Sequence, residues 1–290
     1  MPTSDQLLLL LPLIFLVAAL YSSVGHGGAS GYLAVISLLG FAAKSFVPIV
    51  LTLNVLVASI SFLHYRRPGA FKFGRLLPFV VTSIPASYFG GMWKVSDASF
   101  GIILGIALLA AAVRLILGSG FRGITKDHDR DELQRITPIR NSQFGQPWLP
   151  VIRNSPWAIG LPTGLILGFV SGMIGIGGGV FLSPVLLFLG ITDIKGSAAM
   201  ASAFIVLNSL AGLVGHASIV GDARSFSMLQ ALSMVLPCWH SSVALIAAGI
   251  TGAIVGSRWG ASRTEPRTLQ YALASVLAAA SVKLVLSAMM

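Results

Sequence analysis

Phe169-Val-Ser-Gly-Met-Ile-Gly-Ile-Gly-Gly-Gly-Val-Phe-Leu-Ser-Pro184 interrupts an apolar run that would otherwise predict one long membrane helix. A glycine inside a helix costs about 1 kcal/mol relative to alanine, so the cluster Gly175–Gly179 predicts a break. A second glycine cluster, Gly25-His26-Gly27-Gly28, lies 150 residues earlier between two other apolar runs. In lipid, a broken backbone is tolerated only where it is buried in protein or lines a polar cavity. Two such breaks at matching places predict the binding site of a transporter.

The composition is that of a membrane protein. The chain has 290 residues, of which 55% are hydrophobic and 10% charged, and its mean hydropathy is +0.87. About a quarter of the residues of a soluble domain are charged. The net charge of +10 lies in loops between apolar segments, which favours contact with an anionic membrane surface over binding of nucleic acid. The single Cys238 and five dispersed histidines exclude a disulfide framework and show no metal-ligand spacing, so no metal or cofactor is expected.

Apolar segments occur in the same order in both halves of the chain. Each half begins with a broken pair whose second member is short, and three longer segments follow. The segments are Leu7–Val24, Ala29–Gly40, Ser45–His64, Leu76–Trp93 and Ala98–Leu117, then Ala158–Ile174, Val180–Gly190, Gly196–His216, Phe226–Trp259 and Leu269–Ala288. The first lacks the basic start of a secretory signal, so we expect it to be retained. The fold class predicted is an all-α polytopic membrane protein with about eight to ten membrane segments.

The distribution of basic residues predicts how the two repeats are oriented. Residues 1–117 form the first repeat, 118–156 a hydrophilic linker, and 157–290 the second repeat. Arg and Lys residues favour a cytoplasmic position for the loop at 66–75, for the linker, and for the loop at 258–267. Opposite loops are therefore basic in the two halves, as two inverted five-element repeats require. We expect a multi-pass protein of the inner or plasma membrane, with a cytoplasmic linker and both termini outside.

The glycine breaks predict an anion site without a charged side chain. A helix that restarts after a break exposes N–H groups that have no intrahelical partner, and its positive dipole end attracts an anion. No Asp or Glu falls in the middle of a predicted segment, although cation carriers generally need such a carboxylate. Close helix packing is the alternative explanation of the glycines. Lys44, Lys195, Arg114 and Lys283 are expected to extend towards the membrane interface.

These residues resemble the TauE/SafE (sulfite exporter) family of membrane permeases. The resemblance is carried by the glycine-rich break in each half and by the small-residue helix Ala198-Ala-Met-Ala-Ser-Ala203, which ends near His216. It covers the whole chain apart from the linker. It implies transport of sulfur-containing anions such as sulfite, sulfoacetate or other sulfonates, often outward. The first break departs from the pattern because it contains His26, which can donate to an anion or take a proton.

The candidate site combines the two breaks with polar side chains inside the predicted segments. The expected substrate-binding residues are Ser23, Gly25, His26, Gly27, Gly28, Asn54, Gly175, Gly177, Gly178, Gly179, Ser202 and Asn208. Buried amides and hydroxyls can equally hold helices together. The leading prediction is a secondary transporter that works by alternating access between the repeats and exports its substrate. An anion channel, an intramembrane enzyme and a structural subunit remain alternatives, and a homo-oligomer is left open. No nucleophile motif or nucleotide loop supports an enzyme.

Overall fold

The computed structural model describes residues 4–66, 71, 73–121, 156–189, 191–192, 194–220, 239–262 and 267–289. All regular elements within these ranges are helical. In chain order they are α1 (Ser4–Ser22), α2 (Ala29–Leu38), η1 (Ala43–Phe46), α3 (Val47–Tyr65), α4 (Phe73–Met92), α5 (Asp97–Phe121), α8 (Pro156–Ile174), α9 (Gly179–Phe188), α10 (Ile194–Val220), α12 (Trp239–Ser262) and α13 (Arg267–Met289). Most of the predicted linker 118–156, and the start of the predicted segment Phe226–Trp259, lie outside the described residues.

Four of the described helical segments are long and apolar enough to cross a membrane: Ala43–Tyr65, Asp97–Arg114, Trp157–Ile174 and Lys195–Ile219. Four shorter apolar stretches lie in α1, α2, α12 and α13. Large apolar side chains such as Leu8, Ile106 and Ile166 are exposed on the outside of the bundle. The protein is therefore an all-helical, polytopic membrane protein whose outer surface suits lipid.

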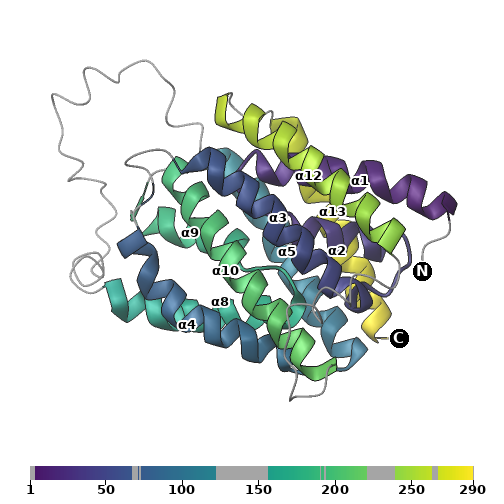
Figure 1. Ribbon diagram of the computed structural model, residues 1–290, viewed down its shortest axis with the longest axis horizontal. Helices are drawn as coiled ribbons and strands as arrows, with labels where there is room; N and C mark the ends of the chain where they lie inside the picture. Colours follow the sequence, from purple (N-terminus) through teal and green to yellow (C-terminus); the bar gives the residue numbers. More distant parts are fainter. Residues whose placement is uncertain are drawn as a thin grey trace.

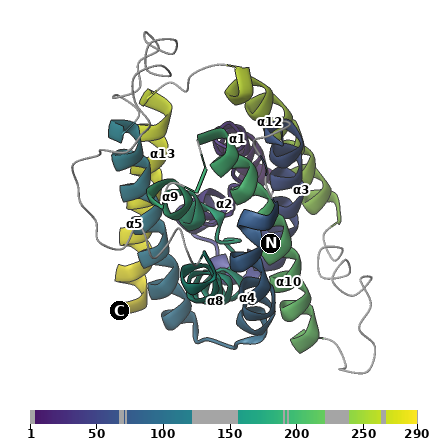
Figure 2. The ribbon, with the colours of Figure 1, turned by 90° about the vertical axis from the view of Figure 1, so that its left-hand side faces the viewer.

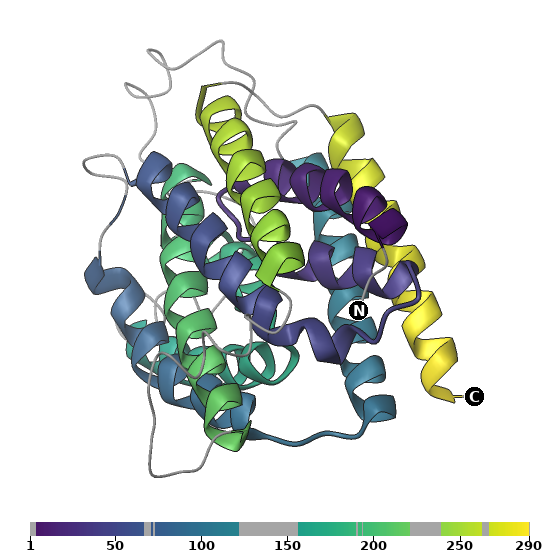
Figure 3. The ribbon, with the colours of Figure 1, turned by 45° about the vertical axis from the view of Figure 1, so that its right-hand side comes forward.

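Each half packs its first helix against the fourth helix of the other half. α1 lies along α12, and α8 lies along α4 (Figures 1 and 3). α3 and α10 cross in the middle (Figure 1), and α5 and α13 pair on one side (Figure 2). Exchanging each element for its counterpart in the other half preserves this pattern of pairs. The segments of the two halves are thus interleaved rather than separated.

Glycines allow these helix pairs to approach closely. Gly160, Gly164, Gly168 and Gly172 recur at every fourth residue of α8, and a Cβ on any of them would come within 2.4 Å of an atom of α4. Gly252 and Gly256 of α12 meet the carbonyl oxygens of Phe15 and Ala19 of α1 in the same way. Small residues at this spacing let backbones pack where lipid supplies no hydrophobic drive between helices. The packing explanation therefore holds for these glycines.

Cations hold the far ends of the two short helices. Lys283 Nζ of α13 donates to the carbonyls of Ser37 and Leu38 at the end of α2, at 2.6 and 3.1 Å. Arg75 of α4 donates to the Ile191 carbonyl just after α9, at 2.5 Å. A cation at a helix C-terminus compensates the negative end of the helix dipole. α2 is therefore fixed to α13, and the end of α9 to α4.

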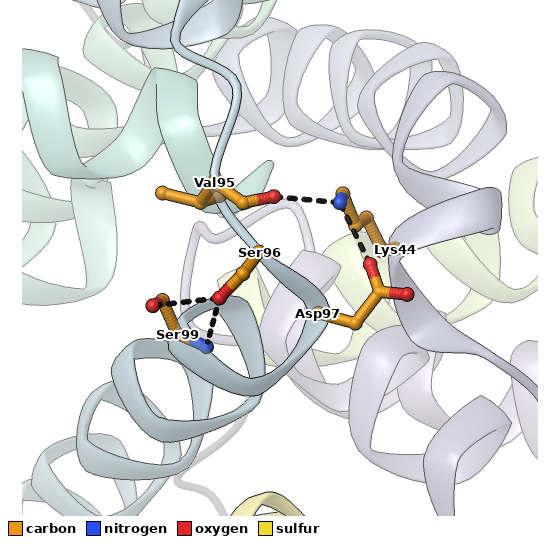
Figure 4. A network of polar contacts seen from close by, with 5 residues as sticks. All are labelled: Lys44, Val95, Ser96, Asp97 and Ser99. Carbon is orange, nitrogen blue, oxygen red and sulfur yellow. Dashed lines mark hydrogen bonds and ion pairs between the residues drawn. The ribbon is translucent and has the colours of Figure 1, made fainter.

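Lys44 joins the loop after α2 to the start of α5 (Figure 4). Its Nζ lies 2.7 Å from the Val95 carbonyl and 2.7 Å from a carboxylate oxygen of Asp97. Ser96 accepts from the Ser99 N–H at 3.1 Å and so caps the first turn of α5. Both side chains of the ion pair are exposed, so solvent and salt screen their attraction. This network fixes the path of a loop rather than stabilising the core.

Candidate functional site

The two glycine breaks share left-handed glycines at their first and last positions, and differ in that Gly177, unlike Gly27, is also left-handed. α1 ends at Ser22 and α2 begins at Ala29, while α8 ends at Ile174 and α9 begins at Gly179. Gly25 and Gly175 both have φ of 78°, and Gly28 and Gly178 precede the short helices with φ of 93° and 72°. Only glycine adopts this left-handed region without strain. Both short helices have ten residues. The predicted breaks and short helices are confirmed.

Asn54 connects the two breaks. Its Oδ1 accepts from the Ala29 N–H at the start of α2, at 3.3 Å. Its Nδ2 donates to the Ile176 carbonyl in the second break at 3.2 Å and to Ser209 Oγ of α10 at 2.9 Å. A Cβ on Gly27 would lie 1.9 Å from Asn54 Oδ1, and one on Gly177 would lie 2.4 Å from Nδ2. The breaks therefore meet at one buried amide, and both amide hydrogens of Asn54 are used within the protein.

The carbonyl groups of the first break are all occupied by side-chain donors. The carbonyls of Ser23, Val24, Gly25, His26 and Gly27 accept, in that order, from Tyr65 Oη, His26 Nδ1, Ser202 Oγ, Ser61 Oγ and Tyr32 Oη. Buried carbonyls need such partners because they have lost water. These bonds hold the non-helical backbone in place and give each of those five carbonyls a partner inside the protein.

The N–H groups at the glycine breaks remain available. Within the described residues, no acceptor meets the N–H groups of Gly27, Gly28, Gly177 or Gly178, and all four glycines are buried. Buried N–H groups without an acceptor are rare in folded proteins. The starts of α2 and α9 add the positive ends of two helix dipoles. The junction of the breaks therefore has more donors than acceptors, as an anion site requires.

His26 lies between the first break, α9 and α5. Its Nδ1 is 3.0 Å from the Val24 carbonyl, which can only accept, so Nδ1 carries the hydrogen. Its Nε2 is 3.2 Å from a guanidinium nitrogen of Arg114, which can only donate, so Nε2 has the lone pair. Ser183 Oγ of α9 is 2.9 Å from the same Nε2. The imidazole is thus neutral, and two donors from different helices converge on it.

Arg114 is the cation beside His26, a position that its sequence pattern did not predict. The expectation that it extends towards the membrane interface is wrong, because its guanidinium lies against His26 inside the bundle. A charged residue within an apolar segment is by default a candidate for function. That signal was present in the sequence, but the position of Arg114 near the end of its segment favoured the other interpretation. Ser183 flanks the second break in the sequence but is not among the predicted binding residues, and neither is Ser209.

The predicted residues do not all come together. Gly27, Gly28, Gly177 and Gly178 lie with Asn54 at the junction, and Gly25 is held by the Ser202 hydroxyl at 2.7 Å. Gly175 packs on Val47 at the start of α3, and Gly179 on Ile205 of α10. Ser23 Oγ donates to the Leu20 carbonyl at 2.7 Å, within its own turn. These residues build the walls of the junction.

Asn208 lies elsewhere, where α10 faces α4. Its Nδ2 donates to the Phe204 backbone carbonyl at 2.9 Å, and the backbone carbonyl of Asn208 accepts from Ser87 Oγ of α4 at 2.7 Å. Its Oδ1 is buried without a partner among the described residues. None of these contacts involves a glycine of either break. The structure therefore separates Asn208 from Asn54, although both occupy the middle of the segment after a break.

A polytopic helical bundle with two buried helix breaks at its centre is the architecture of a membrane transporter. The family model of the Sulfite exporter TauE/SafE matches residues 10–284. The chain belongs to this family, and it is a membrane transporter by class.

The relatives carry names of the same class. "Probable membrane transporter protein y4hK" of Sinorhizobium fredii is 31% identical over 245 residues, which cover 84% of this chain and 86% of the relative. "Probable membrane transporter protein YunE" of Bacillus subtilis is 26% identical over 193 residues, or 66% of this chain and 65% of the relative. MamO of Paramagnetospirillum magneticum, also a probable membrane transporter by name, is 25% identical over 90% of this chain, which spans 41% of that protein. No solved structure matches the chain significantly.

Proposed function

We propose that the protein is a secondary transporter of small sulfur-containing anions, such as sulfite, sulfoacetate or other organosulfonates, and that it exports them from the cell. The observation that carries this proposal is the junction of the two breaks. Four buried N–H groups that meet no acceptor in the described part of the chain belong to the glycines just before the two short helices, two of which contact Asn54. Such groups bind an anion because its oxygens replace the hydrogen bonds that water would supply.

The distribution of charge supports an anion as the substrate. Among the described residues, the only acidic side chains are those of Asp5 and Asp97, which belong to the first turns of α1 and α5. Arg114, by contrast, lies inside the bundle beside the first break. A transporter that binds a cation generally places a carboxylate within the membrane. The family, whose description names sulfite export, supports sulfur as the element that the substrate contains.

Transport would proceed by alternating access between two inverted repeats. The loops that the basic residues predict to lie outside, around Lys44 and Asp97, are bonded to each other. The loops predicted to lie inside, around Arg75 and Ile191, are also bonded to each other. This grouping supports the inverted orientation, in which one half rocks against the other around the central junction.

Transport assays in proteoliposomes test this proposal. Sulfite, sulfoacetate and a taurine-like sulfonate should each be offered on one side, with counterflow measured against unlabelled substrate on the other. We expect saturable flux and counterflow for at least one of them. If none of the three anions is transported, the sulfur assignment is overturned. Conductance without saturation or counterflow would show a channel instead.

A further inference from the structure

The contacts of His26 contain an imbalance between donors and acceptors. Arg114 and Ser183 both point a donor group at Nε2, which has a single lone pair. The Ser183 hydroxyl has one hydrogen and a second acceptor within reach, the Gly179 carbonyl at 3.2 Å. His26 is 2% exposed, so water does not compensate freely. One neutral nitrogen therefore faces both the charged Arg114 guanidinium and a serine hydroxyl whose single hydrogen can also go to the Gly179 carbonyl.

We propose that Arg114 and Ser183 form an anion subsite that the His26 imidazole occupies in the substrate-free protein, and that the substrate's oxyanion group displaces the imidazole from it. This inference rests on the proposed function, because it specifies how the junction holds its anion. The ligand class is a small group with several negatively charged oxygens on one atom, such as sulfite or a sulfonate head. Arg114 and Ser183 are then specificity-determining residues, and His26 competes with the substrate.

The chemistry favours the oxyanion over the imidazole. A guanidinium presents paired N–H groups that match two oxygens of an oxyanion, and hydrogen bonds between charged partners are about twice as strong as neutral ones. A single imidazole nitrogen can accept only one of those N–H groups in good geometry. The Gly27 and Gly28 N–H groups follow His26 directly in the chain and meet no acceptor among the described residues. An oxyanion has enough lone pairs for all of these donors.

The elements that supply the donors explain why such a subsite would serve transport. Arg114 belongs to α5 of the first half and Ser183 to α9 of the second. His26 belongs to the first break, which Ser202 of α10 also holds. An anion that bridges Arg114 and Ser183 therefore contacts both halves at once. The affinity of the subsite for the anion therefore changes when the two halves move relative to each other, as alternating access requires.

Four substitutions of the full-length protein, purified in detergent, test the inference. Arg114→Gln and Ser183→Ala remove the two donors, while His26→Ala and His26→Phe remove the competing acceptor. Lys283→Gln is the matched control, because Lys283 is the counterpart of Arg114 in the second half and contacts the other end of α2. Binding of sulfite, sulfoacetate and phosphate is measured by calorimetry, and thermal unfolding confirms that each variant is folded.

The expected changes differ in sign. Arg114→Gln should weaken binding by about tenfold or more, and Ser183→Ala by about threefold, from the usual strengths of charged and neutral hydrogen bonds. His26→Ala or, if that variant does not fold, His26→Phe should tighten binding by about threefold. Lys283→Gln should leave affinity unchanged. Unchanged affinity in Arg114→Gln, or unchanged or weaker binding in the folded His26 variant, would overturn the inference.

The panel of anions separates this inference from the proposed function. If only phosphate binds, and binding depends on Arg114, then the subsite is supported and the sulfur assignment fails. If a sulfur anion binds and Arg114→Gln binds it equally well, then the proposed function is supported and the subsite is overturned. Absence of any Arg114-dependent anion binding would also overturn the subsite.

Discussion

Asn54 is the residue on which the geometry of the junction depends. Its side chain makes hydrogen bonds to Ala29, Ile176 and Ser209, which belong to three different segments, and it is fully buried. A leucine of similar size would leave buried donors and acceptors without partners. Asn54 therefore determines where the two helix starts lie relative to each other, and its contribution to the proposed anion site is one of positioning.

We expect Asn54→Leu to lower the free energy of unfolding by about 2 kcal/mol or more, because each stranded buried group costs about 1–3 kcal/mol. Thermal unfolding in detergent measures this change. Thr52→Val is the matched control, since Thr52 lies on the same helix and bonds only to the carbonyl one turn before it. Equal effects of the two substitutions would show that Asn54 does not hold the breaks together.

Gly177 combines a left-handed conformation with contact to two polar side chains. Its φ is 76°, and a Cβ there would lie 2.4 Å from Asn54 Nδ2 and 2.7 Å from Ser209 Oγ. Gly177→Ala should therefore reduce transport at least about tenfold by displacing Asn54, at a cost of about 1–3 kcal/mol in backbone strain. Gly74→Ala is the control, because nothing lies within 4 Å of its Cβ position. Transport equal to that of the control would refute a role for the break.

The side-chain contacts at the site could not be read from the sequence. Asn54 was predicted to bind substrate because amides inside membrane segments are unusual, but the pattern does not show that Ile176, far along the chain, uses its donors. The position of Arg114 near the end of its apolar segment suggests the membrane interface, but a position in the sequence does not show in which direction a long, flexible side chain points. His26 is distinctive already in the sequence, and its contacts with α5 and α9 emerge only from the packing.

At the scale of elements, the short helix α2 is held at both ends. Its first N–H is bonded to Asn54, and its last carbonyls accept from Lys283. The sequence predicted this helix because glycines bound it and its twelve-residue apolar run is too short to cross a membrane. It predicted α9 for the same reason. Glycine and proline are strong local signals, so helix boundaries at the breaks were the most predictable part of the fold.

Lys283→Met should destabilise the protein more than Lys44→Met. Lys283 is half-buried and bonds two carbonyls at a helix end, an arrangement worth up to about 2 kcal/mol, whereas an exposed ion pair such as Lys44–Asp97 contributes about 0–1 kcal/mol. Thermal unfolding at low and high salt distinguishes them, because only the exposed pair should lose its contribution in salt. A larger effect of Lys44→Met would contradict this assignment of the two lysines.

The proposed inverted orientation of the halves is tested at the scale of the whole molecule. Lys94 lies in the loop before α5, and Lys195 lies in the first turn of α10, and both are exposed. The inverted arrangement predicts that a membrane-impermeant maleimide applied to intact cells labels Lys94→Cys and not Lys195→Cys, in a Cys238→Ser background. Labelling of both positions from the same side would contradict inversion. If only Lys195→Cys is labelled, the halves are still inverted, but the loops predicted to lie outside the cell lie inside it.

Which helices pair across the bundle was not predictable from the pattern of apolar residues. Helices that face lipid on one side and protein on the other are apolar all round, so periodicity does not mark their contact faces. The glycines at every fourth residue of α8 identify a packing stripe, but they do not identify α4 as its partner. The count and order of segments follow from local composition, whereas the pairing is a property of the completed chain.

The interleaving of the halves has a consequence for how the chain is made. α1 is made well before its main partner α12, which follows more than two hundred residues later. During that time the carbonyls of Phe15 and Ala19 have not yet met Gly252 and Gly256. Until α12 is made, α1 can pack only on the neighbouring helices α2 and α3. A nascent chain that stops after α5 would contain α1 and α4 without α12 and α8, and quality-control proteases would find it incompletely packed.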